Sequence, residues 1–408
     1  MEIVGIDWGR KKHYCYLLHQ GKKLVLKNKE EDFAKLLKIK EAVYVIEDGN
    51  NRIVDYLLRN NRQVYILPSR RSSEARSFFV IEGKSDFIDS KVIAMTYEHN
   101  PEWCLQVKRE GIAFELDVLV EENAVINVSM MQDIGRLDAY LERYWPEVKE
   151  VFSGTSARKL AFISICPTAK DFLSMSDKEI LQKLKEMGFL INSNLKSKLK
   201  ELRKIALERY VPASIRTLIV AFSRYAMEKK VMKEEIGKQM KEIIEESEFS
   251  VLFTLPGVGV IIASQLIVAY LTHKFSSYRD LQRYAGTTPT YYGSGNKNTT
   301  KMRSNCNHYL RGTLHIASLA ATNSSKWMKR FYDNKKSEGK SSAHALRALA
   351  NTILKIAFAM LRDLTPYSEE KFFKRNPLSD YTPSKKEGEQ KPEYSLKVSS
   401  VATCRSTA

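Results

Sequence analysis

Cysteine is sparse in this sequence and lacks the spacing of a structural site. The 408 residues include 5 cysteines, odd in number and scattered along the chain, namely Cys15, Cys104, Cys166, Cys306 and Cys404. No two of them have the spacing of zinc ligands, which argues against a zinc finger and against a disulfide framework. This usage is typical of a protein from a reducing compartment.

Long apolar runs and targeting signals are also missing. The most apolar stretch, 255–271, is interrupted by Gly257, Gly259, Ser264 and Gln265, and it is too short to span a bilayer. The first residues, with Glu2 and then Asp7, do not have the pattern of a signal peptide. There are no internal repeats and no Walker-type phosphate loop. We therefore expect a cytoplasmic protein without a membrane partner.

Positive charge is what the sequence has in excess. The formal net charge is +18 and the sequence pI is about 9.4. A charge of this size favours a polyanionic partner, most simply nucleic acid, although a soluble protein with a basic tail would have the same composition. The hydrophobic content of 43% is ordinary for a globular protein, and the length suggests two or three domains.

The first hundred residues alternate between strand-like and helical patterns. Their order is strand, hairpin, helix, strand, helix, strand and helix, with the hairpin joined at Gly21. A basic, serine-rich segment, 70–79, precedes the last helix, which runs from Asp86 to about His99. This α/β layer pattern matches the order expected of an RNase H-like fold.

Four carboxylates stand where these elements begin or end. Asp7 closes the first strand and Glu47 ends the second, while Asp86 and Asp89 share one face in the first turn of the last helix, which Ser85 can cap. By itself the pair on the helix is most simply explained as acids that suit the positive end of the helix dipole. The two acids from strands make a metal site the better hypothesis.

Asp48 is an alternative to Glu47 as a metal ligand. Neighbours along a strand point to opposite faces, so only one of the two can point into the predicted site. The sequence favours Glu47, which directly follows the apolar run 44–46, without excluding Asp48. Oxygen ligands at this density suit hard divalent cations, so we predict a Mg²⁺ site, with Mn²⁺ as a substitute. Two such ions can activate the attacking oxygen and stabilise the leaving oxygen at a phosphodiester.

A long helical middle follows the α/β part. The pattern is helical from Phe114 to Trp145, and a later helix carries apolar residues three and four apart, with gaps at Lys229 and Gln239. This is a heptad seam. It fits an intermolecular coiled coil and a helix packed inside its own domain equally well. The apolar members are Ile215, Leu218, Phe222, Tyr225, Met232, Ile236 and Ile243.

Two stretches near the C-terminal end suggest nucleic-acid contacts. Gly257 and Gly259, in Pro-Gly-Val-Gly before an apolar helix, have the pattern of a helix-hairpin-helix element, whose backbone N–H groups approach a phosphate. A plain turn is the competing interpretation. The stretch 281–312 is poor in core residues and predicts a functional loop or merely a solvated one. Its basic members are Lys297, Lys301, Arg303 and Arg311.

Ser294 lies between two glycines of that loop, which would expose its hydroxyl. The residues alone favour a solvated loop serine over a functional one.

The order and spacing of several blocks resemble one family. The sequence is similar to the DEDD transposases of insertion sequences, also described as bridge-RNA-guided recombinases and related to Piv-type DNA invertases. The resemblance covers about residues 2–367. The blocks that carry it are GIDWGRKKHY, YVIEDGN, KSDFIDSKVIA, LPGVGVIIA, YAGTTPTYYGSG, MRSNCNHYLR and ALRALANTILKIAFAML.

From about Lys374 the sequence turns polar, with Pro377, Pro383 and Pro392, which predicts a disordered tail over 374–408. For the rest of the chain, the resemblance implies an α/β plus α architecture in three parts. These are a RuvC-like (RNase H-like) DEDD catalytic domain over 1–105, a helical linker and coiled-coil region over 106–250, and a mostly helical C-terminal transposase domain over 251–373 that carries the serine loop and the helix-hairpin-helix-like element. It also implies a prokaryotic, nucleoid-associated protein.

The resemblance assigns roles to the candidate residues as well. Asp7, Glu47, Asp86 and Asp89 would be the metal ligands, and Ser294 would be a nucleophile that attacks a DNA phosphate and forms a phosphoserine link. The implied partners are donor and target double-stranded DNA, a structured guide RNA, and further copies of the chain in a homodimer that assembles to a tetramer.

Departures from the family pattern leave alternatives open. Asp48-Gly49-Asn50 stand where relatives commonly have Ala-Thr-Gly, and Gly293 stands where some have a second serine. Neither change removes a proposed catalytic residue. The alternatives are a site-specific invertase without guide RNA, a RuvC-like structure-specific endonuclease that uses water, and a nucleic-acid-binding protein without activity. The retained acids argue against the last.

Overall fold

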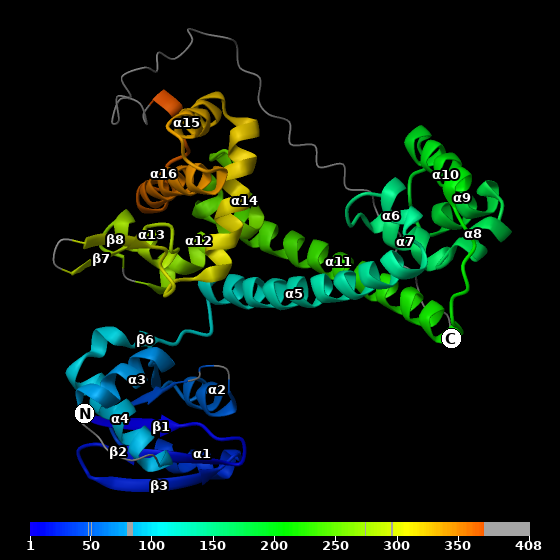
Figure 1. The fold of residues 1–408 in the computed structure, drawn as a ribbon. Coiled ribbons are helices and arrows are strands. Elements are labelled where there is room, and N and C mark those ends of the chain that lie inside the picture. The colour runs from blue at the N-terminus through cyan, green and yellow to red at the C-terminus, as the bar shows by residue number, and fades with distance from the viewer. Residues whose placement is uncertain (48, 50, 80–84, 274, 295–296, 371–408) are drawn as a thin grey trace. The chain divides into compact units, whose positions relative to one another are not determined.

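The computed structural model describes residues 1–47, 49, 51–79, 85–273, 275–294 and 297–370, with the backbone alone at 70, 292–294 and 297–298. The chain forms two compact units (Figure 1). Unit 1 is Met1–Leu116 with Leu266–Ser277, and unit 2 is Asp117–Gln265 with Tyr278–Ala408. The tail predicted over 374–408 lies outside the described residues, and the four predicted domain boundaries stay predictions.

Unit 1 is built on a mixed sheet with the strand order β3-β2-β1-β4-β5-β6. Strand β1 pairs antiparallel with β2 and parallel with β4, and β4 in turn pairs parallel with β5. This order fits an RNase H-like domain, and the predicted β2–β3 hairpin through Gly21 is confirmed. The strands are β1 (Glu2–Asp7), β2 (Lys12–Leu17), β3 (Lys22–Lys27), β4 (Ala42–Ile46), β5 (Gln63–Ile66) and β6 (Leu105–Gln106).

Helices cover both faces of this sheet. Apolar residues of α1 (Glu30–Leu37) and α2 (Arg52–Arg59) pack with Val4 and Ile6 on one face. Helix α4 (Asp86–His99) packs with Ile3 on the other face, and a short 3-10 turn, η1 (Pro101–Trp103), follows it. Strand alternation explains the division, since successive residues of β1 point to opposite faces.

The basic, serine-rich segment 70–79 is helical, which its pattern did not predict. It lies within α3 (Ser69–Phe78), whose N-terminal neighbour is Pro68. Serine and arginine give this helix no continuous apolar stripe, so the periodicity that reveals an amphipathic helix is weak. Helix α3 packs against α4, and a tertiary contact of this kind can stabilise a helix that local propensity does not predict.

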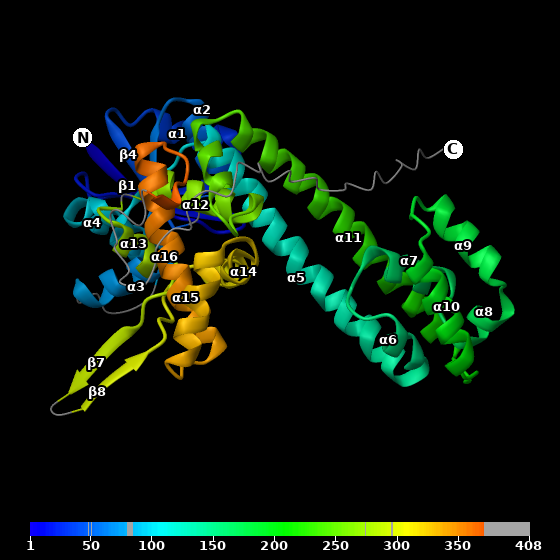
Figure 2. The ribbon, with the colours of Figure 1, turned by 90° about the horizontal axis from the view of Figure 1, so that it is seen from above.

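Unit 2 contains a long pair of helices beside a small bundle (Figure 2). The pair is α5 (Ile112–Tyr144), which begins in unit 1, and α11 (Ala213–Glu245). Trp145, Phe162 and Phe172 contact one another in the core of the bundle. The bundle helices are α6 (Glu147–Val151), α7 (Ala157–Ile165), α8 (Ala169–Ser174), α9 (Asp177–Glu186) and α10 (Ser193–Ile205).

The predicted heptad seam of α11 is confirmed only in part. Ile215 and Phe222 are partly buried against the core of the bundle, whereas Tyr225 and Met232 are 52% and 53% exposed. The buried residues follow the same spacing one residue later and are Ile219, Ser223, Ala226, Met240 and Ile244. Small residues such as Ser223 and Ala226 let α7 approach α11 closely, and the apolar pattern alone assigned those positions to larger neighbours.

A polar layer joins α5 to α11 within the chain. Lys229 Nζ donates to Ser129 Oγ at 2.6 Å and also pairs with Asp133. Lys233 Nζ donates to Asn127 Oδ1 at 2.5 Å. Partly buried polar groups that satisfy one another in this way favour one register of the two helices. The structure therefore shows α11 packed inside its own unit, one of the two alternatives that the sequence left open.

The remaining elements lie C-terminal to α11. The stretch predicted as a loop, 281–312, contains an antiparallel hairpin of β7 (Thr290–Ser294) and β8 (Lys297–Lys301), whose threonines and tyrosines favour strands. The other elements are η2 (Glu248–Thr254), α12 (Val260–Thr272), which crosses between the units, α13 (Tyr278–Tyr284), α14 (His308–Ser324), α15 (Lys326–Ser337) and α16 (Ser342–Asp363).

Helix α16 is the one described helix that is long and apolar enough to cross a membrane by length and composition. However, 61% of its most apolar window is buried inside the protein, and it packs against α13, α14 and α15. Burial of this kind is expected of a core helix.

The two glycines before α12 have different surroundings. Gly257 has φ +80°, and a methyl group there would lie 2.3 Å from the carbonyl oxygen of Ala317. Around Gly259, no atom lies within 4 Å of that position. Gly257 is thus required for close packing on α14, while the helix-hairpin-helix hypothesis stays a prediction.

We expect Gly257→Ala to lower the free energy of unfolding by about 2 kcal/mol or more, because the left-handed backbone and the clash both act against a methyl group. The matched variant Gly259→Ala should lose less than about 1 kcal/mol. Urea denaturation of both variants measures the difference, and equal losses would contradict this account.

Candidate active site

The acidic residues of unit 1 are placed by the packing of α4 on β1. A methyl group on Gly5 would lie 2.0 Å from the carbonyl oxygen of Ser90 and 2.7 Å from the backbone nitrogen of Ala94. The α4 backbone therefore lies directly on β1 at Gly5. The first turn of α4 then lies beside the end of β1, where Asp7 stands. The sequence signal for this contact was a glycine inside a buried strand.

The start of α4 has the predicted cap. Ser85 Oγ accepts a hydrogen bond from the Ile88 backbone N–H at 3.3 Å, and Asp86 and Asp89 lie in the first turn. A capped first turn holds both acids at the positive end of the helix dipole.

Asp7 is electrostatically coupled to all three other predicted ligands. Its pKa is raised from 3.8 to about 6, first by burial and then by the charges of Asp89, Asp86 and Glu47, in that order. The charge of Arg76 acts in the opposite direction. The structure thus brings the four acids into one neighbourhood. Asp48 lies outside the described residues, so its competition with Glu47 stays open.

The donor chemistry of this neighbourhood suits a hard divalent cation. Carboxylate oxygens are the preferred ligands of Mg²⁺ and Mn²⁺, and the mutual repulsion that raises the pKa of Asp7 is what a bound cation would relieve. Among the described residues, no three of the His, Cys, Asp and Glu side chains are close enough to hold one ion. The acids converge, but they do not form a closed coordination shell in this arrangement.

Two arginines that sequence reasoning missed support this edge of the sheet. Arg76 of α3 forms an ion pair with Asp89. Arg109 donates to the carbonyl oxygen of Gly49, two residues after Glu47, and to Asp55 Oδ1 at 3.1 Å. The segment that carries Glu47 is therefore tied to α2 through Arg109. In the sequence, neither arginine has a pattern that identifies its partner.

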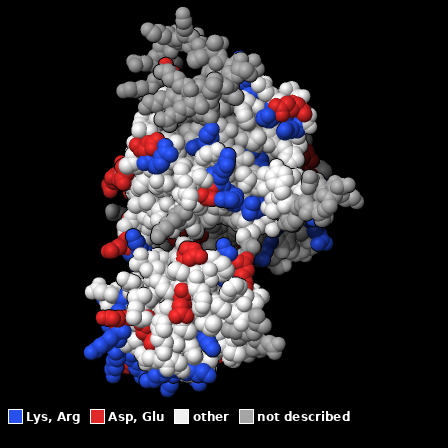
Figure 3. All heavy atoms as spheres, turned by 90° about the vertical axis from the view of Figure 1, so that its left-hand side faces the viewer, with Lys and Arg blue, Asp and Glu red and all other residues white. Residues whose placement is uncertain are grey.

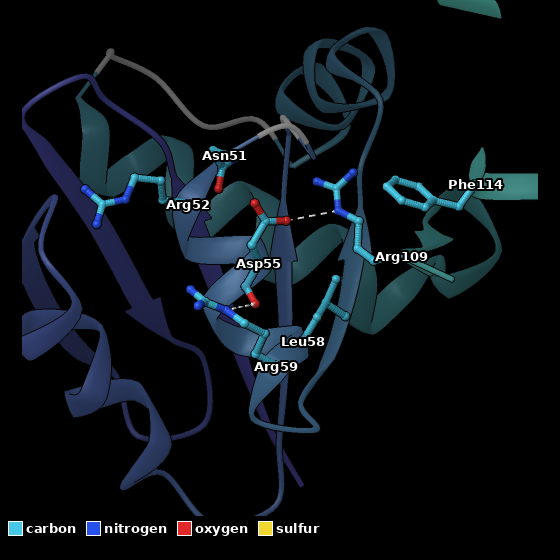
Figure 4. A pocket seen from close by; sticks show the side chains of 7 residues that line it. All are labelled: Asn51, Arg52, Asp55, Leu58, Arg59, Arg109 and Phe114. Carbon is cyan, nitrogen blue, oxygen red and sulfur yellow. Dashed lines mark hydrogen bonds and ion pairs between the residues drawn. The ribbon is translucent and has the colours of Figure 1, made fainter. Parts of the chain in front are cut away.

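A pocket of about 690 Å³ lies along α2 (Figure 4). Arg109 points toward Asp55 in its centre, Arg59 donates to the Asp55 backbone, and Arg52 points away. Arg59 also pairs with Glu30. Because its arginines do not converge on one point, the pocket is better explained as support for the Glu47 segment than as a ligand site.

Lysines line the outer edge of the sheet. Figure 3 shows Lys and Arg side chains gathered at the lower end of unit 1, where Figure 1 places β3. Lys22, Lys23 and Lys27 are exposed on this edge strand. Lysine on an edge protects a sheet from further pairing, and it also suits a phosphate backbone.

Apart from the two glycines before α12, the candidate residues of unit 2 lie in the β7–β8 hairpin and in the segment that follows it. Ser294 ends β7 and pairs in register with Lys297, whose side chain, like that of Ser294, lies outside the described residues. Lys301 is exposed. Arg311 donates to the carbonyl oxygen of Arg303 at 2.9 Å and also contacts His308, so it holds the segment below the hairpin in place.

A second pocket, of about 460 Å³, lies in that segment. It has no acidic lining residue and is bordered by Arg283, Tyr284, Arg303, Asn305, Cys306 and Asn307.

Comparison with known proteins identifies the family. A model of DEDD transposases of the IS110 type, described as "Transposase", matches residues 4–146. A second, described as "Transposase IS116/IS110/IS902 family", matches residues 250–333. The chain belongs to the IS110 family of DEDD transposases. It is therefore an enzyme that cuts and rejoins DNA, of a class that uses divalent metal ions.

Two relatives of this IS110-family transposase come from insertion elements. The "Insertion element IS900 uncharacterized 42 kDa protein" of Mycobacterium paratuberculosis is 24% identical over 405 residues, which cover 89% of this chain and 96% of that protein. The "Insertion element IS110 uncharacterized 43.6 kDa protein" of Streptomyces coelicolor is 32% identical over 132 residues, 32% of this chain and 33% of that protein.

The raised pKa of Asp7 predicts a stability effect in the metal-free transposase. Above pH 6 the folded state holds an unfavourable charge that the unfolded state accommodates freely, so stability falls as pH rises from 3.8 through 6. Because Asp7 is only half-buried, solvent screening reduces the effect, and we expect Asp7→Asn to stabilise the protein by about 1 kcal/mol at pH 7.5 and by less at pH 4.5.

Thermal unfolding with a chelator present measures this difference. The exposed acid Glu31 supplies a control, since Glu31→Gln should have the same small effect at both pH values. An Asp7→Asn protein that is less stable than the wild type at pH 7.5 would contradict the prediction.

Proposed function

We propose that this transposase cuts DNA with a Mg²⁺-dependent DEDD site in unit 1 and joins it through Ser294 as nucleophile, guided by a structured RNA. The observation that supports the metal site best is the raised pKa of Asp7, because its causes include all three other predicted ligands. Asp7, Glu47, Asp86 and Asp89 would hold the ion, and Mn²⁺ would substitute for Mg²⁺. When bound, the ion neutralises charge on the phosphate and favours the serine alkoxide.

Ser294 would attack from the hairpin of unit 2. Its hydroxyl oxygen would form a bond to the DNA phosphorus as the sugar oxygen leaves, which conserves the phosphodiester energy for rejoining. A position at the end of β7, directly before the hairpin connection, supports this role, because a strand end can present a side chain beyond the rest of the domain. The carboxylates and the serine would then form one composite site.

The basic surfaces would hold nucleic acid by its backbone. Backbone N–H groups at Gly257 and Gly259, with the side chains of Lys297, Lys301, Arg303 and Arg311, would contact phosphates of donor and target DNA. The lysines of β3 extend the positive surface in unit 1. The net charge of +18 supports a second polyanion, a guide RNA whose base pairing would read the sequence. We propose assembly as a homodimer and then a tetramer, in the cytoplasm at the nucleoid.

We expect Ser294→Ala to abolish a covalent protein–DNA adduct while leaving DNA binding intact, because only the attacking oxygen is removed. The assay incubates the full-length protein with Mg²⁺, the DNA that flanks its gene and the RNA transcribed from that DNA. Adducts are then resolved on a denaturing gel. Ser304→Ala, an exposed serine of the same stretch, is the matched control and should form the adduct normally.

Each other outcome of this assay has a definite meaning. If Ser294→Ala recombines normally, the serine mechanism is wrong. Cut DNA with free ends and no adduct would favour the endonuclease that uses water. Recombination that does not need the RNA would favour the invertase.

We expect Asp7→Ala to abolish strand cleavage, with a loss of at least about 100-fold, because the remaining acids would no longer surround the ion. The same gel measures free and protein-linked ends together. Glu31→Ala, which removes an exposed carboxylate of α1, controls for general loss of charge and should retain cleavage. Activity of Asp7→Ala at the wild-type rate would exclude the DEDD site.

A further inference from the structure

Arg76 is paired with one of the proposed metal ligands. Its guanidinium Nη2 contacts Asp89 Oδ1, and the two side chains are 27% and 13% exposed. Among the ion pairs of the described residues, this is the one that includes any of the four acids, Asp7, Glu47, Asp86 and Asp89. The contact also joins α3 to α4, which pack together.

The pair lies where opposing charge is most needed. Asp89 is the carboxylate that acts most strongly on Asp7, and Arg76 is the group that offsets this effect. Carboxylates that share a site repel one another, and a partly desolvated carboxylate is costly without a partner. In the metal-free protein, Arg76 therefore supplies part of the positive charge that a divalent ion would otherwise bring.

We propose that Arg76 is a placeholder cation, which pairs with Asp89 in the metal-free protein and releases it when a divalent ion binds. This rests on the proposed DEDD metal site. Two observations support displacement over a permanent contact that orients Asp89. The four acids do not form a closed coordination shell in this arrangement, and Asp89 is the member held by another cation.

A purely structural ion pair between α3 and α4 is the simpler alternative. It would make the protein less stable when Arg76 is replaced. Loss of the positive charge would tighten metal binding under either explanation, so Arg76→Lys, which keeps the charge but weakens the pair, separates the two. Arg71 provides a matched control, because it lies on the same helix but pairs with Glu74 and covers the Trp103 ring at 4.6 Å.

The experiment compares Mn²⁺ binding by the full-length protein without nucleic acid, using calorimetry or the electron spin resonance of free Mn²⁺. We expect Arg76→Gln to bind Mn²⁺ about tenfold more tightly than the wild type, because the ion no longer displaces a charge-assisted hydrogen bond. The metal-free variant should melt at a lower temperature, and saturating Mn²⁺ should raise its Tm by more than it raises that of the wild type. Arg71→Gln should bind Mn²⁺ as the wild type does.

Unchanged or weaker binding by Arg76→Gln would overturn the inference. Arg76→Lys is measured beside it, separates displacement from simple loss of charge, and also serves if Arg76→Gln does not fold. A lysine keeps the charge but pairs less firmly with a carboxylate, so tighter Mn²⁺ binding than the wild type is expected, and equal or weaker binding would again be decisive. Asp7→Asn tests the underlying site. Wild-type binding that is absent, or that Asp7→Asn leaves unchanged, would mean that the metal site itself has failed.

Discussion

The contact of α4 with β1 at Gly5 is the constraint on which the candidate active site depends. No side chain fits between the two backbones there. Asp7 lies two residues beyond Gly5 along β1, and Asp89 directly precedes Ser90, whose carbonyl faces Gly5. The distance between β1 and α4 therefore sets how closely Asp7 and Asp89 approach each other. A larger separation would weaken the coupling that raises the pKa of Asp7.

Cationic side chains complete this arrangement from elements that carry no acid of the site. Arg76 reaches Asp89 from α3, and Arg109 fastens the segment after β4. Arg76 offsets part of the negative charge that gathers in this partly buried place, while Arg109 fixes the backbone beside Glu47. The same principle holds in unit 2, where Lys229 and Lys233 are paired with polar residues of α5 and so give the two long helices a defined register.

Sequence reasoning succeeded where periodicity was strong and local. The hairpin at Gly21, the capped start of α4 and the helix from about Phe114 all follow from neighbouring residues. It failed where a distant partner decides the outcome. The fully buried residues of α11 lie one position after the predicted seam, because α7 packs on its small residues, and helix α3 has no apolar stripe of its own.

The sequence alone predicted which acids belong together, with Asp48 as an alternative to Glu47, because strand ends and a helix start in an α/β order are expected to meet at one edge of a sheet. It also determined the family, through blocks whose order and spacing are characteristic. Only the tertiary structure decided how closely those acids approach and which cations oppose them. Gly5 and Arg76 act through contacts with residues 85 and 13 positions away in the chain, and local patterns contain no information at that separation.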